Sequence, residues 1–232
     1  MGLMTRIVCR LLRLALLLLA STAAAQSDSV ADLPLVELAA ESARPYLAVF
    51  LTGDGGWADL DRQVSARLVA AGVPVVGWNS LKYYWVRRSP EEASRDLERI
   101  LGFYLAKWKK SRVLLVGYSR GADVLPFLAS RLPPGRLKQV RLLALLGPGT
   151  SNRFEPLAVG YTHLGARAPE LPLAPEVGKL RGLRILGFHG TEESDSLCRG
   201  ADPGLLECVE LAGGHHFAGA YTQIAERILA EL

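Results

Sequence analysis

The sequence has few cysteines and few other groups that bind metal ions. Three cysteines and four histidines occur among 232 residues, and Cys9 lies in the N-terminal segment discussed below. The remaining pair, Cys198 and Cys208, has no spaced set of further Cys or His ligands, which a four-coordinate structural zinc site needs. We therefore expect no metal site and no cofactor.

The chain also has little net charge once its N-terminal segment is set aside. The chain carries 27 basic and 23 acidic residues, but the first 25 residues contain three arginines and no acid, which leaves 24 basic and 23 acidic residues in the remainder. Proteins that bind nucleic acids usually concentrate basic residues on one face. This near balance argues against a nucleic acid as partner.

Long hydrophobic runs are missing beyond the N-terminus. There, Arg6, Arg10 and Arg13 are followed by the apolar run 14–20 and by Ala23-Ala24-Ala25. This order is typical of a secretory signal peptide, and the run is shorter than the about 20 residues of a membrane-spanning helix. We expect a cleaved signal peptide over 1–25 and a single periplasmic domain over 26–232.

The expected compartment bears on the two remaining cysteines. Disulfides persist in oxidising compartments, and Cys198 and Cys208 are the only candidates left there. We expect a disulfide between them.

Short apolar runs alternate with amphipathic segments along the chain, which is typical of a parallel sheet covered by helices. The sequence predicts strands at 46–52, 73–78, 112–117, 140–146, 183–189 and 206–211. It predicts helices at 60–71, 90–108, 120–131 and 218–230, the second with Ser89 as its N-cap. The Pro- and Gly-rich segment 147–182 is expected to be irregular. The predicted fold class is α/β, a mostly parallel sheet flanked by helices.

A candidate nucleophile lies directly after one predicted strand. The strand at 112–117 leads into Gly117-Tyr118-Ser119-Arg120-Gly121, and a predicted helix follows. A strand, a sharp Gly-flanked turn and a helix form the nucleophile elbow of α/β-hydrolases, where the turn exposes the serine hydroxyl. We predict an α/β-hydrolase fold without a large cap domain, with Ser119 as nucleophile.

A serine nucleophile needs a base and an acid, which follow it in the order acid, then histidine, in this fold. The predicted base is His216 in the Gly213-Gly214-His215-His216-Phe217 run, and His215 is the alternative. The predicted acid is Asp195, with Glu193 as the alternative, because both follow the strand at 183–189. A Cys198–Cys208 disulfide would fasten this acid loop to the strand that leads towards the histidines.

Ester hydrolysis also needs backbone N–H groups that stabilise a developing oxyanion. The residue after the nucleophile, Arg120, is one expected donor. The Gly-rich run Thr52-Gly53-Asp54-Gly55-Gly56-Trp57 follows an early strand and is expected to supply the second donor from Asp54 or Gly55.

Taken together, these runs resemble a known family. The glycine-rich run, the elbow, the two loops and the run Asn79-Ser80-Leu81-Lys82-Tyr83-Tyr84-Trp85 are similar to those of the bacterial virulence protein VirJ/AcvB family. The resemblance implies a periplasmic α/β-hydrolase that cleaves the aminoacyl ester of aminoacyl-phosphatidylglycerol, lysyl or alanyl, and it supports Asp195 as the acid. Secretion-system proteins are further possible partners.

Two expectations concern recognition of such a lipid. Asp54 and Asp123 are candidates to bind the free ammonium of the aminoacyl group, and Tyr84 and Trp85 are candidate substrate contacts. The aromatic and basic run 83–88 is expected to touch a membrane surface transiently, because aromatic side chains favour the interface and arginines attract anionic phosphate. Two alternatives stay open: a general periplasmic esterase or thioesterase, and a non-catalytic accessory protein on a hydrolase scaffold.

Overall fold

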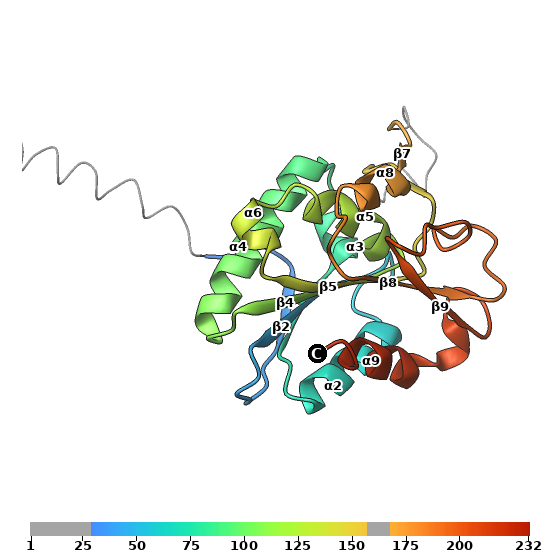
Figure 1. The fold of residues 1–232 in the computed structure, drawn as a ribbon. Helices are drawn as coiled ribbons and strands as arrows, with labels where there is room; N and C mark the ends of the chain where they lie inside the picture. Colours follow the sequence, from blue (N-terminus) through green and yellow to red (C-terminus); the bar gives the residue numbers. More distant parts are fainter. Residues whose placement is uncertain (1–28, 157–167) are drawn as a thin grey trace, which may run out of the picture.

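A computed structural model of the chain describes residues 29–156 and 168–232, in which a seven-stranded sheet forms the centre of the molecule (Figure 1). The strand order is β1-β3-β2-β4-β5-β8-β9. All neighbouring strands are parallel except for β1, which pairs antiparallel with β3. The predicted signal peptide lies outside the described residues.

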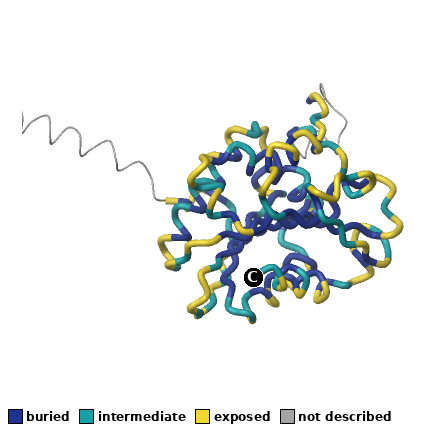
Figure 2. The backbone as a smooth tube through the Cα atoms, viewed as in Figure 1, coloured by how far each residue is buried: buried dark blue, intermediate teal, exposed yellow. Residues whose placement is uncertain are grey.

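The six predicted strands all form and all belong to this sheet. They are β2 (Tyr46–Leu51), β3 (Val75–Trp78), β4 (Arg112–Tyr118), β5 (Val140–Leu146), β8 (Ile185–Gly190) and β9 (Glu207–Leu211). Except in the edge strand β9, which is only partly buried, their residues are mostly buried on both faces, which is why these sequences are nearly continuous apolar runs instead of alternating ones. Figure 2 shows this buried band across the middle of the molecule.

Helices cover both faces of the sheet. Along β2, Leu47, Val49 and Leu51 pack in the core beneath α4 (Pro90–Lys107) and α5 (Arg120–Ala129), whereas Ala48 and Phe50 pack in the core beneath α2 (Asp59–Ala70) and α9 (Tyr221–Leu229). This alternation follows from the two-residue period of a strand. The four predicted helices are therefore confirmed, with ends that differ by a few residues.

Several short elements were not predicted. They are β1 (Leu35–Leu38), α3 (Ser80–Tyr83), α6 (Pro134–Leu137), the β6 (Ser151–Asn152) and β7 (Leu171–Pro172) pair, α8 (Leu173–Gly178) and the turn η1 (Phe217–Gly219). The segment predicted to be irregular therefore contains a small hairpin and a helix in its described part. No helix among residues 29–156 and 168–232 is long and apolar enough to cross a membrane.

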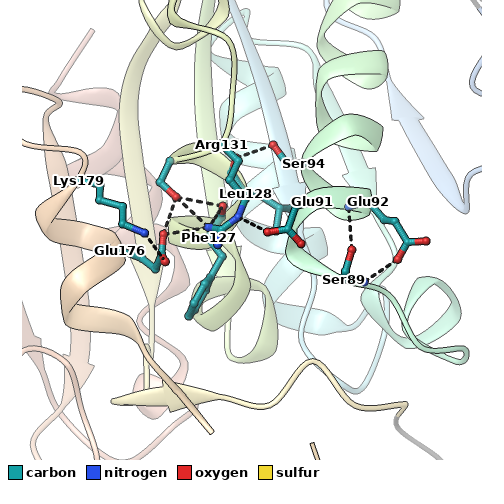
Figure 3. Close-up of polar contacts among 10 residues, drawn as sticks. Ser89, Glu91, Glu92, Ser94, Phe127, Leu128, Arg131, Glu176 and Lys179 are labelled. Atoms are coloured by element: carbon teal, nitrogen blue, oxygen red, sulfur yellow. Dashed lines mark hydrogen bonds and ion pairs between the residues drawn. The ribbon is translucent and has the colours of Figure 1, made fainter. Parts of the chain in front are cut away.

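A polar network ties α8 to the helix that follows the predicted nucleophile (Figure 3). Glu176 of α8 accepts hydrogen bonds from Ser130 Oγ at 2.6 Å and from Arg131 Nη1 at 3.0 Å, directly after α5. The Arg131 guanidinium also donates to Glu91 of α4 at 2.9 Å. This network links the C-terminal end of α5 to two other helices.

Asp61 is a buried carboxyl that makes stability depend on pH. Its Oδ2 accepts a hydrogen bond from the Ala58 N–H at 2.9 Å, whereas its Oδ1 is buried with no partner among the described residues. Burial raises the pKa of Asp61 from its usual value near 4 to about 7. The folded state therefore favours the neutral acid, and ionisation at higher pH destabilises it.

We expect the free energy of unfolding of the Asp61→Asn variant to change less with pH than that of the parent chain. The parent should lose roughly 4 kcal/mol of this contribution as pH rises from about 4 to about 7, at 1.36 kcal/mol per pKa unit. Urea unfolding at pH 4 and pH 8 measures the difference. Asp59→Asn, an exposed position on the same helix, is the control; equal pH dependence in parent and Asp61→Asn would contradict the expectation.

Candidate active site

Ser119 occupies the turn between β4 and α5 in a backbone conformation that L-residues rarely adopt, with φ 53° and ψ −121°. The surrounding backbone is crowded: a Cβ on Gly117 would clash with the Gly121 carbonyl, and a Cβ on Gly121 would clash with the Leu51 carbonyl. Only glycine fits at both positions. The turn has the geometry that the G-x-S-x-G pattern predicts for a nucleophile elbow.

His215 and Glu193 are brought together as a hydrogen-bonded pair. His215 Nδ1 lies 2.6 Å from Glu193 Oε1, and the Glu193 side chain is only 9% exposed. Glu193 Oε2 accepts the Gly190 N–H at 2.6 Å, which fixes the carboxylate at the end of β8. A carboxylate on Nδ1 orients the imidazole and leaves Nε2 to take a proton from a nucleophile.

Backbone contacts place this pair next to Ser119. The Ser119 N–H donates to the Leu146 carbonyl at 2.9 Å, and Gly147 follows at once. A Cβ on Gly147 would lie 2.8 Å from His215 Cε1 and 3.4 Å from Glu193 Oε1, so the Gly147 backbone packs against both side chains. The positive φ of Gly147, 62°, is a second reason for glycine there. The sequence analysis missed Gly147, although its place directly after a buried strand was a signal.

Tyr118, the residue before Ser119, also contacts His215. Its ring stacks on His215 with 5.2 Å between centroids and 29° between planes. Its hydroxyl donates to the His215 carbonyl at 3.2 Å and lies 3.0 Å from His216 Nδ1. Burial raises the pKa of Tyr118, so the phenol stays protonated as a donor.

His216 and Asp195, the first choices for base and acid, are not brought together. The ring of His216 contacts the Tyr118 hydroxyl, and Asp195 Oδ1 accepts from Thr150 Oγ1 at 2.8 Å. Within residues 29–156 and 168–232, neither is hydrogen-bonded to a residue that would complete a base and acid couple. We therefore replace the first choices by the alternatives, His215 and Glu193, which share a hydrogen bond.

The Gly-rich loop packs against the nucleophile, as expected of an oxyanion loop. A Cβ on Gly53 would lie 3.1 Å from Ser119 Cβ. The N–H groups of Asp54, Gly55 and Arg120 have no acceptor within the described part of the chain. Asp54 follows the glycine that contacts Ser119, so we favour its N–H together with that of Arg120 as the oxyanion donors.

Three aspartates lie near the elbow, in different electrostatic states. Asp54 Oδ1 accepts from Arg120 Nε in an ion pair, which neutralises its charge. Asp123 accepts the Gly149 N–H at 2.8 Å, and burial raises its pKa to about 7. A Cβ on Gly149 would lie 3.3 Å from Asp195 Oδ2 and 3.5 Å from Asp123 Oδ1, so these two carboxylates flank one backbone position. In the described ranges no three His, Cys, Asp or Glu side chains are placed to hold a metal ion.

The two aromatic residues expected to touch substrate face different ways. Tyr84 is 1% exposed, and the Arg120 guanidinium lies 5.8 Å from the centre of its ring. Trp85 is 60% exposed. Tyr84 therefore supports Arg120 from within, and Trp85 projects away from the core.

The expected disulfide joins Cys198 and Cys208 across a Cα–Cα distance of 5.7 Å. It ties the loop after β8 to β9 and holds the neighbouring Arg199 close to the acid. Arg199 Nε donates to the Glu193 carbonyl at 2.7 Å. The acid loop is thus held by its own backbone, by Arg199 and by the disulfide.

We expect Arg199→Ala to lower kcat several-fold, because the substitution frees the backbone of Glu193. The lost hydrogen bond corresponds to about 1 kcal/mol, or about fivefold. Steady-state kinetics on a soluble ester measure the change. Arg181→Ala, which removes an exposed pair with Asp202, is the control; an unchanged kcat for Arg199→Ala would show that the contact does not position the acid.

Solved structures similar to this chain share its architecture. Est1E from Butyrivibrio proteoclasticus, solved with bound ferulic acid, aligns with a TM-score of 0.61 and 12% identity over 86% of this chain and 95% of that one. The esterase domain of a Rhodothermus marinus protein aligns with a TM-score of 0.58 and 16% identity over 85% and 96%. XC6422 from Xanthomonas campestris, described as an α/β serine hydrolase without a lid, aligns with a TM-score of 0.52 and 15% identity over 84% and 88%. The chain has the α/β-hydrolase fold.

Sequence comparison identifies the family more narrowly. No curated protein sequence matches the chain. A family model described as bacterial virulence protein (VirJ) matches residues 45–232, which include every strand of the central sheet except β1, together with the elbow and both loops of the site. The chain is a member of the VirJ family of α/β-hydrolases.

Proposed function

We propose that the protein is a periplasmic serine hydrolase that cleaves the aminoacyl ester of aminoacyl-phosphatidylglycerol, releasing the amino acid and phosphatidylglycerol. The observation that carries the proposal is the His215–Glu193 hydrogen bond beside a strained serine turn, since this arrangement activates a hydroxyl for attack on an ester. The Cys198–Cys208 disulfide supports an oxidising compartment.

In this mechanism Ser119 Oγ attacks the aminoacyl carbonyl and His215 Nε2 takes its proton. The oxyanion of the tetrahedral intermediate accepts hydrogen bonds from the N–H groups of Arg120 and Asp54. His215 then returns the proton to the departing glycerol hydroxyl of the lipid. Water, activated by the same histidine, attacks the acyl-enzyme ester, releases the amino acid and restores the serine hydroxyl.

The carboxylates near the elbow support an aminoacyl group rather than a plain acyl group. Asp54 is already neutralised by Arg120, which leaves Asp123 and Asp195 as the acids without a cationic partner among the described residues. Burial raises the pKa of Asp123 to about 7, and a neighbouring cation would favour its ionised form. We propose Asp123 as the contact for the substrate ammonium, in place of Asp54.

A cavity that reaches the candidate site at Thr150 offers room for part of a larger substrate. Its volume is about 270 Å³, and its wall includes Thr150, Leu197 and Leu205. Thr150 is also the hydrogen-bond donor to Asp195. The cavity therefore borders the acidic side of the candidate site.

The purified mature protein should release lysine from lysyl-phosphatidylglycerol in detergent micelles, and Ser119→Ala should release none above background. Asp123→Asn should lower the ratio of kcat/KM for an aminoacyl ester over that for a plain acyl ester by about tenfold or more, the value of a hydrogen bond to a charged group. Asp59→Asn, an exposed acid away from the site, is the control. Equal lipid loss with parent and Ser119→Ala would contradict the mechanism, and activity on soluble esters alone would favour a general esterase.

A further inference from the structure

Two large hydrophobic side chains project into solvent at one turn. Trp85 is 60% exposed and Val86 is 51% exposed, and they are the exposed large hydrophobic residues of the described ranges. Both lie in the turn between α3 and α4. Exposed apolar side chains gathered at one place mark an interaction surface more often than isolated ones do.

Cations without partners surround this turn. Lys82 and Arg87 are exposed and form no ion pair or hydrogen bond through their side chains within residues 29–156 and 168–232. We call Lys82, Trp85, Val86 and Arg87 the Trp85 patch. The patch contains two cations and no acid. Of the acids nearby, Asp32 and Asp96 are paired with Arg99 and Glu91 with Arg131, whereas Glu92 is bonded to Ser89.

The Trp85 patch lies next to well-packed, buried side chains. Directly before it, Tyr83 donates its hydroxyl to Asp96 Oδ2 at 2.7 Å, and both Tyr83 and Tyr84 are buried. Arg88, directly after it, lies 5.0 Å over the Tyr83 ring. The turn therefore presents its exposed side chains from a fixed base, so little ordering is needed when they bind.

The same segment is attached to the candidate oxyanion loop. The Ser80 N–H donates to Thr52 Oγ1 at 2.9 Å, and a Cβ on Gly56 would lie 3.2 Å from the Asn79 side chain. At the other end, Tyr84 lies against Arg120, the residue after the nucleophile. The segment that carries the Trp85 patch therefore contacts both the glycine-rich loop and Arg120.

We propose that the Trp85 patch docks the protein on an anionic lipid bilayer, with Trp85 and Val86 in the interface and Lys82 and Arg87 on lipid phosphates. Tryptophan favours the depth of the lipid headgroups, and cations are attracted to an anionic leaflet. The exposed residues are one indole and one small aliphatic side chain, which suits a fluid interface better than the larger apolar core of a stable protein interface. The expectation that the whole run 83–88 meets the membrane is corrected: the two tyrosines are buried.

The surface is tested by vesicle co-sedimentation, with all variants made in the Ser119→Ala background so that no lipid is consumed. We expect binding to phosphatidylcholine vesicles that contain phosphatidylglycerol, weaker binding to phosphatidylcholine alone, and loss of binding with added salt. Arg87→Glu and Lys82→Glu should each weaken binding at least about fivefold, the equivalent of about 1 kcal/mol per basic residue. Trp85→Ala should weaken it about tenfold.

Arg141→Glu is the control, because Arg141 is exposed at the opposite end of the sheet strands, near the start of β5. Unchanged binding by Trp85→Ala or by Arg87→Glu would overturn the proposal, as would failure of the parent to bind anionic vesicles. The docking proposal rests on the proposed function in one respect only, namely that the substrate is a membrane lipid. Arg87→Glu with intact Ser119 should cleave a soluble aminoacyl ester at the parental rate, so a failure of the surface is distinguishable from a failure of the catalytic proposal.

Discussion

Replacing His215 by alanine is expected to lower kcat/KM by about 10⁴-fold or more, the loss seen when a triad base is removed. His215 is the histidine whose Nδ1 bonds to Glu193 and whose ring packs on Tyr118. His216→Ala removes only a contact with the Tyr118 hydroxyl and should cost less than about tenfold. Kinetics on a soluble ester measure both variants.

The two variants control for each other, because they differ by one position in the same exposed turn. Thermal unfolding should be similar for both, since both side chains are exposed. A large loss for His216→Ala with a small loss for His215→Ala would reverse the assignment. Large losses for both would mean that His216 positions Tyr118 more strongly than one hydrogen bond accounts for.

Glu193→Gln is the second substitution with a large expected effect. A neutral amide would present the wrong group to His215 Nδ1 and would no longer stabilise the imidazolium, so kcat should fall by about 10³- to 10⁴-fold. Asp195→Asn breaks only the contact with Thr150 and should change kcat on a plain ester by less than about tenfold. Both are measured in the same steady-state assay.

A loss of activity in Asp195→Asn that equals that of Glu193→Gln would contradict the assigned pair. Glu193→Asp serves as the conservative variant: the shorter side chain keeps the charge and should recover part of the activity. A Glu193→Asp variant as inactive as Glu193→Gln would show that the length of the side chain is decisive, not its charge alone.

The sheet could be predicted from the sequence because parallel strands are buried on both faces. The run Val140–Leu146 is apolar except for the exposed Arg141 near its start and ends at Gly147, and this strand has the predicted bounds. The edge strand β1 is half-exposed and only four residues long, so no continuous run marks it. Helix α8 lies in a Pro-rich segment and is held by Glu176 contacts to another helix, which local sequence does not reveal.

The elbow turn could be predicted because it requires glycine on both sides of Ser119. The base and acid could not be chosen with the same certainty, because adjacent residues in a loop point in directions set by the loop backbone. Here Glu192 N–H donates to the Gly213 carbonyl at 3.0 Å, which aligns the two loops and directs Glu193 towards His215. Which of two adjacent loop residues faces its partner is therefore decided by contacts between loops that are far apart in the sequence.

The aromatic run shows the same limit. Tyr83, Tyr84 and Trp85 are adjacent, and the sequence gives no direction for each ring. The short helix α3 turns the two tyrosines into the core and leaves Trp85 outside. We therefore propose the membrane contact for Trp85 and its neighbours alone, and not for the two buried tyrosines.

The central claim, that Ser119 is activated by His215, is tested most directly by labelling with a fluorophosphonate and mapping the modified peptide by mass spectrometry. The account predicts a label on Ser119 in the parent chain, labelling slowed at least about 10³-fold in His215→Ala, and near-parental labelling in His216→Ala. A label on another residue, or a parental labelling rate in His215→Ala, would contradict it.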